Sequence, residues 1–190
     1  MRNYLNRIWF ILYYFCFGGL YKKLAFKTVL YPSVRVQGKK YISLGNRTVV
    51  QRGGWLLALK IDDKEPVLSV GENCAIGDFC HIASVGAVVI EDNVLIANKV
   101  YISDNIHNFA RVDTPVIQQG IQFKGPVTIK EGAWIGENVC IIAANVGKNS
   151  VVGANSVVTH DVPDFSVAVG SPARVIKRYD FETQQWVSIG

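Results

Sequence analysis

The chain has 190 residues, of which 49% are hydrophobic, and its formal net charge is +5 at pH 7. This length suits one domain with short appendages, and the composition excludes wholesale disorder. The spacing of Cys16, Cys74, Cys80 and Cys140 fits neither a CxxC zinc motif nor a secreted disulfide framework, so we expect a protein of the reducing cytoplasm.

Positive charge is concentrated in the first third of the chain. Residues 1–61 contain eleven Lys and Arg and no Asp or Glu, whereas the remainder contains nine basic and fifteen acidic residues. This asymmetry favours an anionic partner, such as a membrane surface or a polyanionic sugar carrier. A nucleic-acid partner is not expected, because no nucleic-acid-binding motif accompanies the charge.

The first predicted element is a hydrophobic helix within a basic N-terminal segment, residues 1–33. Its uncharged core, Ile8–Tyr21, is fourteen residues long and is flanked by Arg7 and Lys22. This is short of the roughly 18–20 residues that span a bilayer, and no A-x-A cleavage site follows. Two alternatives stay open: a helix packed against the domain or a sister subunit, and an interfacial helix on a membrane.

An aliphatic residue then recurs every six positions, often followed by Gly, Ala or an acid. The members of this series are Val70, Ile76, Ile82, Val88, Ile90, Ile96, Ile102, Ile129, Ile135, Ile141, Val146, Val152 and Val158. A period of six fits neither a helix nor an alternating strand. It predicts triangular coils stacked about 4.8 Å apart, with the aliphatic side chains pointing into the prism. We therefore expect an all-β, parallel β-helix over residues 34–170.

One long interruption and a tail complete the predicted organisation. Residues 105–126 contain no hexad, which predicts a loop that protrudes from the prism, and long loops in compact repeats are usually functional. The tail, residues 171–190, is expected to form a helix or a strap over the prism or over a neighbouring subunit.

Several motifs carry a resemblance to a known family. They are Ile90–His107, Lys124–Val127, Ala133–Gly136, and Val151–Pro163 with Gly170–Arg174. In type and order they resemble the hexapeptide-repeat acetyltransferases, in the branch with galactoside, maltose, capsule and lipopolysaccharide O-acetyltransferases. The resemblance implies a left-handed β-helix, an exception to the right-handed crossover preference. It also implies a homotrimer with active sites between subunits, acetyl-CoA as co-substrate, and no metal.

The same resemblance implies that His107 is the catalytic base. Histidine suits proton transfer near neutral pH, and a sugar hydroxyl needs such a base when it attacks a thioester. The chain departs from the family's Asp-His-x-His pattern, because Asn105 stands at the first histidine position; this change is expected to alter substrate contacts. Asp104 either orients His107 or caps a turn. His81 is expected to pack on the surface, with a substrate contact as the alternative.

The resemblance also assigns a coenzyme A groove. The residues carried over to it are Trp134, Ala143, Ala144, Ala154, Thr159, His160, Arg174 and Lys177. Arg174 and Lys177 would contact the phosphates. His160 stands where relatives commonly have lysine. For Trp134, a buried aromatic corner is the alternative to a groove lining.

The function that we expect is O-acetylation of a sugar hydroxyl during surface polysaccharide biosynthesis (capsule, O-antigen or exopolysaccharide), on the cytoplasmic face of a membrane. The first alternative is N-acetylation of a nucleotide-linked amino sugar; the lack of a Gly-rich βαβ segment in residues 1–69 favours O-acetylation. A second is a γ-carbonic-anhydrase-like zinc site, which needs three interfacial histidines. A third is a non-catalytic scaffold.

Overall fold

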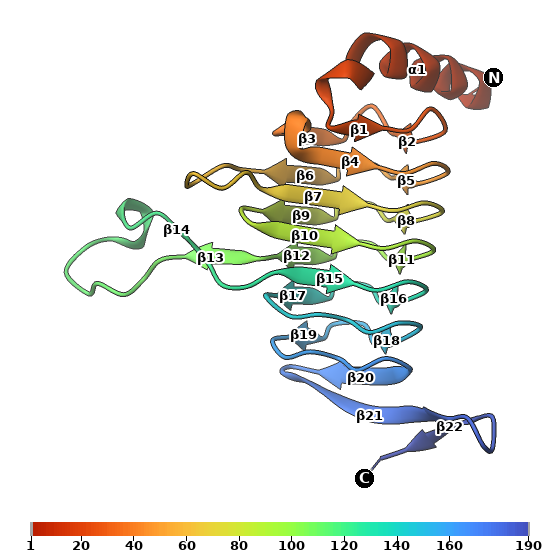
Figure 1. Cartoon of the computed structure of the whole chain (residues 1–190), viewed down its shortest axis with the longest axis vertical. Coiled ribbons are helices and arrows are strands. Elements are labelled where there is room, and N and C mark those ends of the chain that lie inside the picture. Colours follow the sequence, from red (N-terminus) through yellow and green to blue (C-terminus); the bar gives the residue numbers. More distant parts are fainter. Residues whose placement is uncertain (1, 190) are drawn as a thin grey trace.

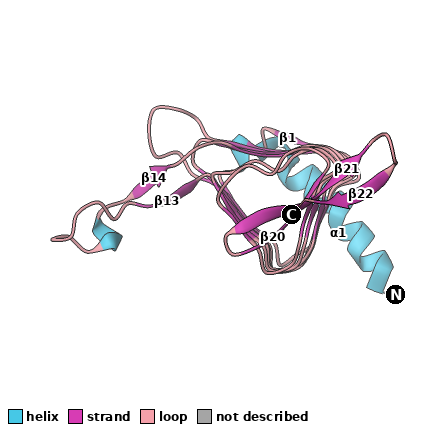
Figure 2. Cartoon of the chain, turned by 90° about the horizontal axis from the view of Figure 1, so that it is seen from below, coloured by secondary structure: helices cyan, strands magenta, loops and turns pink. Residues whose placement is uncertain are grey.

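The computed structural model describes residues 2–189, with side chains from residue 8 onward, and its main body is a left-handed parallel β-helix. Figure 1 shows the stacked coils edge-on, and Figure 2 shows their triangular cross-section along the stack. This confirms the predicted fold class.

Three sheets form the faces of the prism. Sheet A contains β1 (Lys23–Leu24), β4 (Ile42–Leu44), β7 (Val67–Val70), β10 (Ala87–Ile90) and β15 (Val127–Ile129). Sheet B contains β2 (Val29–Leu30), β5 (Val49–Val50), β8 (Ala75–Ile76), β11 (Leu95–Ile96), β16 (Trp134–Ile135), β18 (Val151–Val152) and β20 (Ser166–Gly170). Sheet C contains β3 (Arg35–Gln37), β6 (Trp55–Ala58), β9 (His81–Ser84), β12 (Tyr101–Ser103), β17 (Cys140–Ile142) and β19 (Val157–Val158). These strands pair in parallel, each with the strand one coil away.

The predicted hexad residues form the core. Ile76, Ile82, Ile96 and Ile102 are each at most 1% exposed, and they lie on successive strands of sheets B and C. The small residues after them are needed for close approach of the coils. A Cβ atom added at Gly77 would lie 2.6 Å from the backbone of Ala97, a separation that only glycine avoids.

The coils begin earlier than the predicted boundary at residue 34. β1 and β2 already pair in parallel with β4 and β5. The N-terminal helix α1 (Arg2–Phe17) and the 3-10 turn η1 (Gly18–Leu20) precede this first coil, and α1 crosses the end of the stack (Figure 1). A second 3-10 turn, η2 (Lys39–Tyr41), joins β3 to β4.

The predicted protruding loop is present. It contains an antiparallel pair, β13 (Asn105–His107) and β14 (Ile121–Phe123), with the 3-10 turn η3 (Val116–Gln118) near its tip. Figures 1 and 2 both show this hairpin extending far from the prism.

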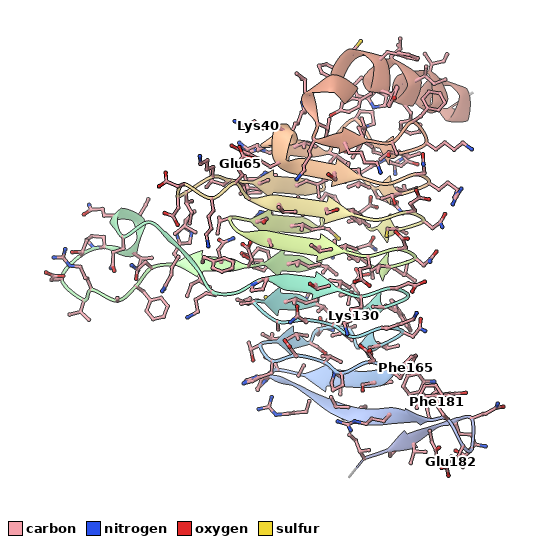
Figure 3. All side chains as sticks on the ribbon, in the orientation of Figure 1. Lys40, Glu65, Lys130, Phe165, Phe181 and Glu182 are labelled. Carbon is pink, nitrogen blue, oxygen red and sulfur yellow. The ribbon has the colours of Figure 1, made fainter. Side chains whose placement is uncertain are left out.

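The helix considered for the tail is wrong. Residues 173–188 form β21 (Ala173–Asp180) and β22 (Gln185–Ser188), which continue sheet B in antiparallel order after β20. The physical reason is alternation with a period of two: Ala173 and Val175 pack against the core while Arg174 is exposed. Phe181, in the turn between the two strands, packs its ring edge-on against that of Phe165, with the centroids 5.0 Å apart (Figure 3).

Candidate active site

Most of the predicted site residues lie along one edge of the prism, which we call the loop edge. It is the edge where the chain passes from sheet C to sheet A, and it comprises residues 59–66, 85–86, 104–126, 143–145 and 159–161. At the other two edges, the strands are joined by tight corners of about four residues in every coil. The longer loops that leave the prism are therefore found at the loop edge.

His107 is held by the stem of the protruding hairpin. It pairs with Ile121 across the two strands, and Asn105 pairs with Phe123 one pair closer to the prism. Directly opposed residues, and residues two positions apart on a strand, share one face of an antiparallel ribbon. His107 and Phe123 therefore project from the same face of the hairpin. In this single chain the imidazole is exposed, so it is accessible to a ligand.

Asp104 caps a turn and does not orient His107. Its buried carboxylate accepts hydrogen bonds from the Val85 backbone N–H (2.9 Å), the Gly86 N–H (2.8 Å) and the Ser84 hydroxyl (3.0 Å). Its carbonyl oxygen also accepts the Lys124 N–H (2.9 Å), at the base of β14. The residue thus joins the hairpin base to the corner of the neighbouring coil.

Asn105 is not available for the substrate contact that we expected. Its side chain is buried, and its amide donates a hydrogen bond to the Asp104 carboxylate at 2.8 Å. The asparagine at the family's first histidine position thus supports the base of the hairpin stem.

His81 packs on the surface of sheet C, the first of its two predicted roles. Its ring is stacked on Trp55 with centroids 4.2 Å apart, and Tyr101 meets it edge-on at 5.2 Å. Its Nε2 atom is buried and has no hydrogen-bond partner among the described residues. Burial, and then the nearby Arg35 guanidinium, lower the pKa of His81 because both disfavour the imidazolium.

A hollow of about 540 Å³ lies beside the hairpin on the loop edge. It is lined by the loop between β6 and β7, with Asp62, Asp63, Lys64 and Glu65, and by Phe123. Phe123 sits directly on Gly86, where an added Cβ would lie 2.4 Å from the ring. The sequence analysis missed this hollow, although the step of twelve residues from Leu56 to Leu68, both buried, is a visible signal of an extra loop.

Three of the residues assigned to the cofactor lie on the loop edge and are accessible. Ala143 is partly exposed, and Thr159 and His160 are exposed and joined by a 3.1 Å hydrogen bond. The assignment of Ala144 is wrong for its side chain, which is fully buried in the core. The slip of register between Ile141 and Val146 turns it inward.

A hollow below the last coil brings one further assigned residue, Arg174, together with His160. His160 and Arg174 both line a space of about 340 Å³ at this end of the prism. Lys177 is exposed on β21, where it pairs with Val167. The cationic side chains of Arg174 and Lys177 are placed where an anionic group could reach them.

Two residues assigned to the coenzyme A groove lie away from the loop edge of the prism. Trp134 projects from sheet B and is 49% exposed, so the buried aromatic corner is wrong. Ala154 is exposed at the corner between sheets B and C. One chain therefore does not gather all of the predicted groove residues on one face.

Comparison with known proteins gives the family. A family model described as the hexapeptide repeat of succinyl-transferase matches residues 67–104 and 126–160, and the gap between the two matches is the hairpin. The galactoside O-acetyltransferase of Lactococcus lactis is 32% identical over 63% of this chain and 69% of its own length. The chain belongs to the hexapeptide-repeat acetyltransferase family.

Two further members of the hexapeptide-repeat acetyltransferase family are informative. An Escherichia coli K12 protein with the provisional name lipopolysaccharide biosynthesis O-acetyl transferase is 36% identical over 63% of this chain, and the match spans only 65% of that relative. A galactoside acetyltransferase solved with coenzyme A is 28% identical, with a TM-score of 0.60 over 84% of this chain and 66% of that one.

The likeness to AntD, an N-acyltransferase from Bacillus cereus, concerns the fold alone. That structure, solved with dTDP and 3-hydroxybutyryl-CoA, has a TM-score of 0.73 over 96% of this chain and 90% of its own, at 18% identity. Among the side chains of residues 8–189, no group of three or more possible metal ligands is present. His81 and His107 lie on β9 and β13, and His160 lies in the turn after β19.

Proposed function

We propose that this chain is an acetyltransferase that transfers the acetyl group of acetyl-CoA to a sugar hydroxyl. The observation that carries the proposal is His107, exposed on a hairpin stem that is anchored to the prism by Asp104. Membership of the family supports the reaction class. The names of the E. coli and L. lactis relatives support oxygen as the acceptor atom and a saccharide as the acceptor.

In the proposed mechanism, His107 accepts the proton of the sugar hydroxyl as its oxygen attacks the thioester carbonyl. The tetrahedral oxyanion is stabilised by backbone N–H donors and then collapses, breaking the carbon–sulfur bond. Coenzyme A leaves as a thiolate and takes the proton back from His107. The acetyl ester and free coenzyme A are the products, and the imidazole is regenerated neutral.

We propose that the acceptor sugar occupies the hollow of about 540 Å³ on the loop edge. The carboxylates of Asp62, Asp63 and Glu65 can accept hydrogen bonds from hydroxyl groups, and the Phe123 ring offers a face for the sugar's C–H groups. Because His107 shares the ribbon face of Phe123, a sugar in this hollow lies on the side from which the imidazole projects.

Coenzyme A would bind in a groove completed by a second copy of the chain. This part of the proposal rests on the division of the assigned residues between the loop edge, with Thr159 and His160, and sheet B, with Trp134. Two copies packed side by side can bring these surfaces together, in a homotrimer with three equivalent grooves. The proposed setting is surface polysaccharide biosynthesis at the cytoplasmic face of a membrane.

N-acetylation of an amino sugar is the second candidate. The charge of the hollow favours it, because its three carboxylates outnumber the single ammonium of Lys64 and would attract an amino group. Screening nucleotide-linked and lipid-linked sugars, with and without amino groups, while following thiol release from acetyl-CoA separates the two candidates.

The test of the mechanism is His107→Ala in the full chain, with Val112→Ala at the fully exposed hairpin tip as control. General-base loss is expected to lower kcat about 10²–10⁴-fold while coenzyme A affinity measured by calorimetry is unchanged. Val112→Ala should retain normal kcat. Full activity of His107→Ala would refute the mechanism.

A further inference from the structure

Helix α1 presents two apolar faces, and only one is covered by the prism. On the covered face, the Trp9 indole N–H donates to the carbonyl of Leu30 at 3.2 Å, and the Tyr13 hydroxyl lies 2.7 Å from that of Tyr21. These contacts fix the helix on the first coil. The predicted packing against the domain is thus present, and it leaves the other face free within the described part of the chain.

The free face is a continuous stripe of large apolar side chains. Ile8, Ile11, Leu12 and Phe15 are 54%, 49%, 56% and 73% exposed. Their spacing of i, i+3, i+4 and i+7 places them on one side of the helix. Phe26, 55% exposed on the first coil, extends the stripe, with its ring centroid 6.4 Å from that of Phe15. Exposed apolar surfaces of this kind mark interaction sites.

The charges around the stripe decide between possible occupants. Lys22, Lys23 and Lys27 are exposed and lie within four residues of Phe26 in the sequence, and residues 1–61 contain no acidic side chain. A second copy of the chain docked stripe to stripe would bring these like charges together. An anionic bilayer instead satisfies both features, since it offers acyl chains to the stripe and acidic headgroups to the lysines.

The position of α1 suits a membrane surface. The helix lies across one end of the stack, so its length can rest in the plane of a bilayer interface while the prism extends away (Figure 1). No helix among the described residues is long and apolar enough to span a membrane.

We propose that the α1 stripe and Lys22, Lys23 and Lys27 form a docking surface for an anionic membrane. The stripe inserts among the acyl chains near the headgroups, and the lysines remain at the headgroup level. This surface is separate from the loop edge, so the proposal does not depend on the acetyl transfer.

The experiment is sedimentation of the full chain with vesicles of pure phosphatidylcholine or of phosphatidylcholine with 30% phosphatidylglycerol. Two variants remove the proposed contacts: Ile11→Ser with Phe15→Ser, and a triple Lys→Gln change at residues 22, 23 and 27. The matched controls are Val112→Ser with Ile117→Ser, which are 103% and 88% exposed on the hairpin, and Lys99→Gln, an exposed lysine on a corner of the prism.

The wild type and both controls should bind the anionic vesicles equally, and the stripe variant should lose at least tenfold in partition coefficient. The lysine variant should lose about a hundredfold, since each lysine near an anionic surface contributes about fivefold. Unchanged partitioning of either variant overturns the proposal. So does a change in oligomeric mass of the stripe variant by light scattering, because the stripe would then be a contact between copies. Thiol release with a soluble acceptor should be unaffected in both variants, which keeps this outcome distinct from that of the proposed function.

Discussion

The stacked coils and the loop edge follow different rules. In the coils, position decides identity: Ile82, Ile96 and Ile102 are buried because each strand turns one side chain inward, and the corners between sheets A and B keep the same length from coil to coil. On the loop edge, the two chain departures differ in length, and they include the carboxylates of the β6–β7 loop, the Phe123 ring and the His107 imidazole. The repeat therefore supplies rigid support, and the longest loops of the described residues leave it at this one edge.

The first prediction tests whether inward-facing side chains of the coils matter more for stability than outward-facing ones, using neighbouring residues on β11. Ile96→Ala should lower the free energy of unfolding by about 2–5 kcal/mol, because it leaves a cavity between coils that cannot collapse. Leu95→Ala, at a side chain that is 49% exposed, should cost clearly less. Chemical denaturation of both variants measures the difference, and equal losses would contradict the distinction between inward and outward positions.

The second prediction tests the connection between the coils and the loop edge. Asp104→Asn should destabilise the chain by about 2–3 kcal/mol, since an amide nitrogen replaces an oxygen that accepts buried N–H groups. Transfer should also fall, because the hairpin that holds His107 loses its anchor. Asp92→Asn is the control, because that carboxylate accepts the Glu72 N–H at 2.7 Å in an exposed corner. Comparable losses in the two variants would show that burial at Asp104 has no special effect.

A third prediction concerns the floor of the hollow. Gly86→Ala should displace the Phe123 ring, which an added Cβ would approach to 2.4 Å. We expect KM for the acceptor to rise several-fold, with a stability loss of about 1 kcal/mol, since the half-exposed ring can move. Gly19→Ala, with nothing within 4 Å of the added atom, should change neither quantity. An unaltered KM in Gly86→Ala would exclude the hollow as the acceptor site.

The smallest expected effect lies on the outer face of sheet C. The pKa of His81 is lowered by burial, so the unfolded chain binds a proton at higher pH than the folded chain. The contribution of His81 to stability is therefore full above the unfolded pKa, about 6.5, and declines as pH falls below it. His81→Gln should reduce the loss of stability between pH 7 and pH 5. A profile identical to that of the wild type would mean that His81 titrates normally.

Much of this contrast was predictable from the sequence. The hexads predicted the coils because inward aliphatic residues are required by the packing itself, and the absence of hexads after Ser103 predicted the hairpin as a protruding segment. Its internal pairing was not predictable. The backbone N–H groups of Val85 and Gly86 that bind Asp104 were not predictable either, because backbone groups leave no trace in residue type. The hollow was missed for a similar reason: Phe123 and the loop of Asp62 are distant in sequence and meet only through the stack.

The strands of sheet C fix the distance between the first coil and the base of the hairpin. β3, β6, β9 and β12 are consecutive in that sheet, so β12 lies three inter-strand steps, about 14 Å, below the first coil. A stack of hydrogen-bonded coils does not stretch or bend as a flexible linker would. Helix α1 and the hairpin stem are thus held apart as by a rigid spacer, and adding or removing a whole coil would change their separation in increments of about 4.8 Å.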